Sequence, residues 1–135
     1  MKYILPYLFC SLISITGIAQ TDTIGPDDVV FEWYQTQEKA EFPGGEDSMR
    51  RYIAANLVIP AIAGEEALSG TIVLAFVVEK DGRLTEIKVV STRRMGFGLE
   101  EAVIAVIIGM PKWKPAMASD KPVRMKMIVP IRIEL

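Results

Sequence analysis

The chain has 135 residues, with 15 basic and 17 acidic side chains, one cysteine and no histidine. This length fits one domain, alone or with a tail, and half of the residues are apolar, so a hydrophobic core can form. A formal net charge of -2 argues against nucleic-acid binding by neutralisation of phosphates. Without histidine the chain lacks the usual general base, and one cysteine cannot build a Cys/His zinc site. These absences exclude much of enzymology, and we expect no metal or cofactor.

Residues 1–20 have the layout of a secretory signal peptide. Lys2 supplies a positive charge, residues 3–19 carry no charge, and the small residues Gly17 and Ala19 stand at the two positions that a signal peptidase reads. We expect cleavage at the end of this segment. The alternative is an uncleaved membrane anchor, because the apolar run is close to the ~18–20 residues that span a bilayer.

An acidic leader follows at residues 21–40. It contains Gly25-Pro26, shows no clean period and has Lys39 as its one basic residue. The apolar residues 29–31 and Trp33-Tyr34 could form a short strand that docks on the rest of the protein. The alternative is a flexible leader. We assign the ordered domain to residues 41–135.

Two helices are expected in this domain. The turn Phe42-Pro43-Gly44-Gly45 precedes two acidic residues suited to a helix N-terminus, and apolar residues then recur at helical spacing until Pro60 ends the helix. A second helix is expected from Gly98 to about Met110. Its apolar stripe is broader, which favours deeper burial.

Three strands are expected as well. Residues 71–79 are apolar at both alternating sets of positions, which is typical of a central strand. Asp81-Gly82 marks a hairpin turn, so residues 84–91 should return antiparallel as the second strand. Residues 121–135 alternate apolar and mostly polar side chains, as in a strand with one buried face.

Connection rules then order these strands. A helix between the second and third strands makes those two run parallel, with a right-handed crossover. The order is therefore second, first, third, and the third strand lies at an edge. Pro130 agrees with this position, because proline donates no hydrogen bond to a ladder. The sequence predicts a two-layer α+β fold: a three-stranded antiparallel sheet in the order 2-1-3, packed against two helices.

The exposed edge is the candidate functional feature. Its backbone groups could receive an extended peptide as an added strand, and its basic side chains would favour an acidic or polar ligand. The alternative is an ordinary edge on which charges and proline oppose aggregation. The candidate peptide-binding residues are Val123, Arg124, Met125, Lys126, Met127, Ile128, Val129, Pro130, Ile131, Arg132 and Ile133.

Few other side chains suggest a site. The acidic pairs Asp27-Asp28 and Glu65-Glu66 lack the neighbours that a calcium loop or a carboxylate dyad needs. Trp113 stands between two lysines and could stack a sugar, although the simpler interpretation is that it anchors a connector onto the core.

Several short motifs occur in a fixed order along the domain. They are Glu41-Phe42-Pro43-Gly44-Gly45, Ile59-Pro60, Phe76-Val77-Val78-Glu79-Lys80-Asp81-Gly82, Met110-Pro111-Lys112-Trp113-Lys114-Pro115 and Lys121-Pro122-Val123. Together they resemble the C-terminal domain of TonB, in the form found in Bacteroidota, over Glu41 to Leu135. The chain differs from a full transducer of that family because no proline-rich spacer stands between Ala19 and Phe42.

This resemblance implies a non-enzymatic periplasmic domain that binds the TonB box of outer-membrane TonB-dependent transporters. The box would add as a strand beside Val123–Ile133 and so support energised nutrient uptake. An anchor retained at residues 1–20 would instead hold the chain in the inner membrane, facing the periplasm. Contact with the ExbB–ExbD motor is expected only in that case.

The alternative function is an envelope interaction module on the same fold that transmits no force. Such a module would bind peptidoglycan or a partner protein, or act as a regulator. An open strand edge also allows a homodimer, formed by edge pairing or by swapping.

Overall fold

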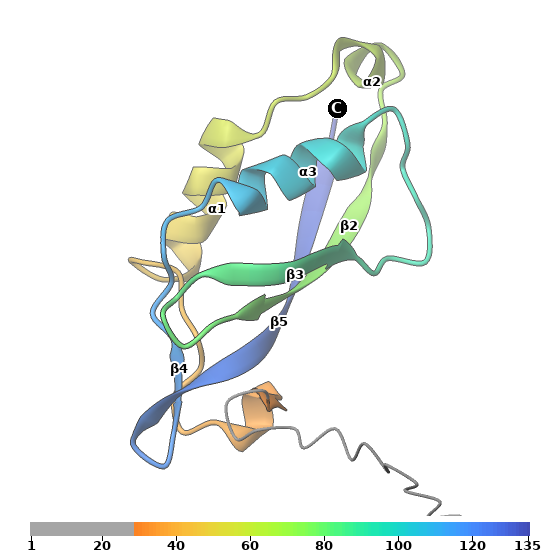
Figure 1. Cartoon of the computed structure of the whole chain (residues 1–135). Helices are drawn as coiled ribbons and strands as arrows, with labels where there is room; N and C mark the ends of the chain where they lie inside the picture. The colour runs from red at the N-terminus through yellow and green to blue at the C-terminus, as the bar shows by residue number, and fades with distance from the viewer. Residues whose placement is uncertain (1–28) are drawn as a thin grey trace, which may run out of the picture.

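The computed structural model describes residues 29–135 (Figure 1). The expected signal peptide at residues 1–20 and the start of the leader lie outside the described residues. None of the helices in the described part of the chain is long and apolar enough to cross a membrane. The elements are β1 (Val30–Phe31), a 3-10 turn (Trp33–Gln35), α1 (Glu46–Asn56), α2 (Ala61–Glu65), β2 (Ser69–Val78), β3 (Leu84–Val89), α3 (Leu99–Ile108), β4 (Ala116–Ala118) and β5 (Lys121–Glu134).

A mixed sheet of five strands forms one layer of the fold. Its strands lie in the order β1-β5-β2-β3, and β4 pairs with the first residues of β5. β2 is antiparallel to both β3 and β5, whereas β1 runs parallel to β5. Figure 1 shows α3 lying across one face of this sheet, with α1 beside it.

The α+β class is confirmed, and the predicted helices and strands correspond to α1, α3, β2, β3 and β5. The expectation of a three-stranded antiparallel sheet with two helices is wrong for the whole fold. β1 and β4 add two strands, the parallel β1 makes the sheet mixed, and α2 is a third helix. β1 and β4 have two and three residues, which is too short for a hydrophobic period to register.

The central position of β2 explains its two apolar faces. Ile72, Leu74, Phe76 and Val78 belong to the core on the helix side of the sheet. Ala75 and Val77 are also buried, although they point to the opposite face. Their cross-strand neighbours on β3 and β5 are Lys88, Thr85, Ile128 and Lys126, so longer side chains on both sides enclose them.

Trp113 joins three parts of the chain. Its ring lies edge-on to Phe42 and to Phe76, with centroids 5.8 and 5.4 Å away. Its backbone N–H donates to the carbonyl of Gly82 in the hairpin turn, at 2.9 Å. Because only 4% of Trp113 is exposed, its ring is not a platform for a sugar, and its interpretation as a core anchor is confirmed.

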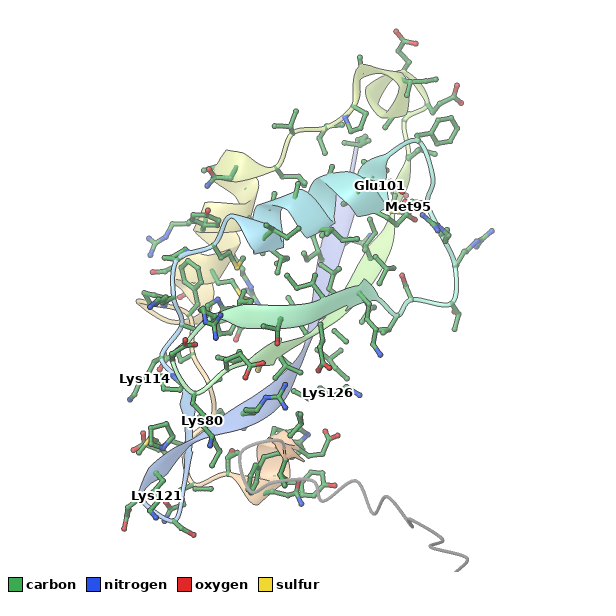
Figure 2. All side chains as sticks on the ribbon, viewed as in Figure 1. Lys80, Met95, Glu101, Lys114, Lys121 and Lys126 are labelled. Atoms are coloured by element: carbon green, nitrogen blue, oxygen red, sulfur yellow. The ribbon has the colours of Figure 1, made fainter. Side chains whose placement is uncertain are left out.

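Glu100 closes the loop before α3. Its carboxylate is buried and accepts hydrogen bonds from the backbone N–H groups of Met95, at 2.5 Å, and Gly96, at 3.1 Å. Burial would raise the pKa of Glu100, but these backbone hydrogen bonds and the nearby Arg94 hold the pKa below its ordinary value. Figure 2 shows Met95 and Glu101 together at this end of α3. The carboxylate thus fixes the loop by which the chain enters the helix.

Gly82 should not tolerate a side chain. Its φ of +86° favours glycine, and a Cβ there would clash with the backbone of Trp113. We expect Gly82→Ala to lower the free energy of unfolding by about 3 kcal/mol, measured by urea denaturation. Gly64→Ala in α2 is the matched control, because no atom of the described residues lies within 4 Å of its Cβ position, and it should be neutral or slightly stabilising. Equal effects of the two substitutions would contradict this account of the turn.

Candidate functional site

The ladder between β2 and β5 determines which backbone groups of β5 point outward. It pairs all ten residues of β2 with β5 without a shift. The N–H of Val90 donates to the carbonyl of Val73, so the backbone groups of Val73 point toward β3 and away from β5. Pro130 is the partner of Val73 in the ladder, so its own backbone groups point away from β2.

Every second residue of β5 shares this outward orientation. β1 covers the outward side at Arg124 and Met125, with which Val30 and Phe31 pair. Farther along, no other strand of residues 29–135 lies beside the outward groups of Ile128, Pro130 and Arg132. These three residues are termed the open rim of β5.

The open rim forms one wall of a groove of about 1030 Å³, at the upper end of the ~300–1,000 Å³ typical of ligand clefts. Met49 and Ile53 of α1 form the opposite wall, together with Leu57 directly after the helix. Residues 38–42 and the connector at Trp113 complete the lining. The charged side chains around the groove are Glu38, Lys39, Glu41, Glu46, Arg50, Lys114 and Arg132.

The groove stays open because α1 is held by groups other than the rim. The hydroxyl of Tyr52 donates to the carbonyl of Gly109 at the end of α3, at 2.7 Å. The ring of Tyr52 also packs on Phe42, with centroids 5.6 Å apart. Tyr52 therefore holds α1 against the end of α3 and against Phe42, which precedes α1 in the chain.

The predicted site residues 123–133 all lie on β5 but fall into different surroundings. Val123 pairs with β4, and Ile133 is buried in the core. The residues from Met127 to Arg132 line the groove. The prediction that this strand forms a free edge along its whole length is wrong for its first part, because β1 lies outside it.

The sequence pattern did not reveal the wall that α1 provides. Met49, Ile53 and Leu57 have the spacing of an amphipathic helix that faces a core, which is the usual meaning of that spacing. In the structure the same stripe packs on the core and lines the groove. A period of 3.6 residues identifies the apolar face of a helix. It does not show whether that face packs on another element or borders an open groove.

An ion pair fixes the start of β5 next to β1. The Nε and Nη2 atoms of Arg124 donate to the two carboxylate oxygens of Glu79, at 2.7 and 3.0 Å, and both side chains are largely buried. The Thr85 hydroxyl donates to the same carboxylate at 2.5 Å. The hydrogen bond from Arg124 is the largest cause that lowers the pKa of Glu79, and it outweighs the opposing effect of burial.

The Glu79–Arg124 pair should stabilise the fold in a pH-dependent way. Because the folded-state pKa of Glu79 lies below its unfolded value, its contribution is complete above the unfolded pKa and is lost as the pH falls through the folded pKa. We expect Glu79→Gln to lower the free energy of unfolding by about 2 kcal/mol at pH 7, and by less in acid. Urea denaturation at several pH values measures both.

Asp81→Asn is the control for this pair. Asp81 contacts Arg83 at 2.6 Å, but both side chains are well exposed, so the substitution should cause little change. An effect of Glu79→Gln that is the same at all pH values would contradict the role of the carboxylate charge.

Among residues 29–135, no group of acidic side chains is placed to hold a metal ion. Figure 2 shows Lys80, Lys114, Lys121 and Lys126 distributed over the half of the molecule that contains β4 and the start of β5. The site is therefore a groove with an apolar lining and a backbone edge, surrounded by charges of both signs.

This chain is similar to a known protein family and to a solved structure. The family model described as the C-terminal domain of the Gram-negative bacterial TonB protein matches residues 55–135. A similar solved structure is the NMR solution structure of the TonB C-terminal domain of Helicobacter pylori. It has a TM-score of 0.49 and 22% sequence identity, and the match covers 69% of this chain and 86% of that chain. Comparison with curated protein sequences gives no match.

Proposed function

Because this chain belongs to the family of Gram-negative bacterial TonB C-terminal domains, we propose that its groove receives the TonB box of an outer-membrane transporter as an added strand. The family is a non-enzymatic periplasmic interaction domain, and its members interact with TonB-dependent transporters. The observation that carries the proposal is the open rim of β5 beside an apolar groove. Binding there would support energised uptake of nutrients.

The rim suits a short extended peptide. Ile128 and Arg132 offer a donor and an acceptor each, and Pro130 offers an acceptor, at the spacing of alternate residues in a strand. A peptide that adds here would turn every second side chain toward the apolar wall of α1. Backbone hydrogen bonds supply affinity in this binding mode, and pockets for alternate side chains supply specificity.

Charge contributes less than the sequence suggests. Arg124 is paired with Glu79, and Arg132 contacts Glu134 at 2.8 Å. These ion pairs weaken the expected preference for an acidic ligand, because the basic side chains already have counter-charges. Affinity is therefore proposed to come mainly from backbone pairing and apolar contacts.

A bulky side chain that projects from α1 into the groove should weaken peptide binding. Ala54 is exposed and lines the groove, whereas its neighbour Ala55 is exposed and does not. We expect Ala54→Trp to weaken the binding of synthetic TonB-box peptides at least tenfold, and Ala55→Trp to leave it unchanged. Isothermal titration of peptides taken from transporters of the same genome measures both, and circular dichroism checks that the helix is intact.

The outcomes of this titration separate the two functions. Saturable binding that only Ala54→Trp removes supports strand addition in the groove. Equal weakening by the two tryptophans would place the peptide elsewhere. No binding of any TonB-box peptide would contradict the proposal and favour the envelope interaction module.

A specific observation supports that second function. Trp33 and Tyr34 are 56% and 68% exposed, their rings meet edge-on at 5.7 Å, and the Lys39 ammonium lies 4.7 Å from the Trp33 ring. Exposed aromatic rings of this kind suit a sugar or a partner protein. Under this function, Trp33→Ala reduces binding to purified peptidoglycan in a pull-down assay and leaves the affinity for TonB-box peptides unchanged.

Coupling to the ExbB–ExbD motor is a separate proposal and depends on residues 1–20. A retained segment would anchor the chain, whereas a cleaved one would release it into the periplasm. The mass of the mature chain after cell fractionation distinguishes the two. A mature chain that starts at Gln20 or Thr21 would contradict motor coupling.

A further inference from the structure

We infer that Pro130 makes the open rim selective for a strand of another protein over a second copy of this chain. Pro130 is exposed, lies within the groove lining and occupies an outward position of β5. Its ring therefore removes no hydrogen bond from the ladder with β2. It does remove the middle one of the three N–H groups that the rim would otherwise present.

Two copies of this chain could pair with each other, because both carry the same open rim. Closed dimers are most often built on a two-fold axis, and two identical edges related by that axis run antiparallel. In a hydrogen-bonded residue pair of an antiparallel ladder, two hydrogen bonds form, one donated by the N–H of each residue. A full pairing of two β5 rims would thus extend the sheet from one molecule into the next.

Symmetry doubles the effect of proline in that pairing. If Pro130 faces Ile128 or Arg132 of the other copy, the pair lacks one hydrogen bond, and the symmetric pair lacks another. If Pro130 faces Pro130 of the other copy on the two-fold axis, that single pair lacks both of its hydrogen bonds. Every two-fold register that places Pro130 opposite the rim of the second copy therefore loses two hydrogen bonds.

A guest strand meets Pro130 only once. It loses one hydrogen bond, to the N–H that proline lacks, and it still donates to the Pro130 carbonyl. The guest carbonyl left without a partner lies in an open groove, where water can hydrate it. Pro130 thus weakens self-pairing more than it weakens guest binding.

Substitution of Pro130 tests the inference. Pro130→Ala restores one rim N–H in each copy, so we expect self-association to tighten about thirtyfold in sedimentation equilibrium of the purified full chain. The affinity for a synthetic TonB-box peptide should rise only about fivefold. Pro130→Val, which restores the same N–H with higher strand propensity, is the second variant if the alanine variant does not fold.

Two controls isolate the rim. Pro122 also lies exposed on β5 but pairs with β4, so Pro122→Ala should change neither measurement. The double variant Ile128→Pro/Pro130→Ala moves the proline to the neighbouring rim residue, and it should restore weak self-association. Unchanged self-association of folded Pro130→Ala or Pro130→Val would overturn the inference, as would tightening that the double variant does not reverse.

The inference rests on the proposed function only for the identity of the guest. If the peptide does not bind but Pro130→Ala associates more tightly, the proposed function fails and the role of Pro130 in self-pairing stands. If the peptide binds and self-association is unchanged in the folded variant, the proposed function stands and the role of Pro130 fails.

Discussion

The antiparallel ladder between β2 and β5 is the constraint on which the rest of the structure depends. Its unbroken register over the whole of β2 divides β5 into two alternating sets of residues. One set points its backbone toward β2 and its side chains into the core. The other points its backbone outward, which is why Pro130 removes no hydrogen bond from the ladder and why no strand of residues 29–135 pairs with Ile128 and Arg132 on their outward side. A shift of one residue would turn Arg124 toward the helix side of the sheet and Met125 away from it.

Much of this could be predicted from the sequence, because long periodic segments carry their own signal. The alternation from Val123 to Ile133 predicts a strand and its buried face, and Pro130 predicts that this strand lies at an edge. Val30 and Phe31 pair with that strand from a leader that has no period, so their parallel pairing depends on tertiary contacts alone. The groove was not predicted for a related reason. Its width depends on the position at which Tyr52 and Phe42 hold α1, and no local sequence pattern encodes that position.

The two walls of the groove differ in their relation to the family. The matched range, residues 55–135, contains all of β5 but only the last two residues of α1. The backbone edge thus belongs to the part that defines the family, whereas Met49 and Ile53 stand before it. On α1 itself, Met49 and Ile53 belong to the buried core, whereas Arg50 and Ala54 are exposed and line the groove.

The two tryptophans occupy opposite environments, and this makes them separate optical reporters. Trp113 lies in the aromatic cluster with Phe42 and Phe76, so its emission is that of an apolar site and changes when the core melts. Trp33 is half exposed next to Lys39, a residue at the border of the groove, so soluble quenchers reach it in the folded chain. Intrinsic fluorescence of a single sample therefore reports on two places at once, the apolar cluster at the inner side of the groove and the exposed ring beside its border, without any added label.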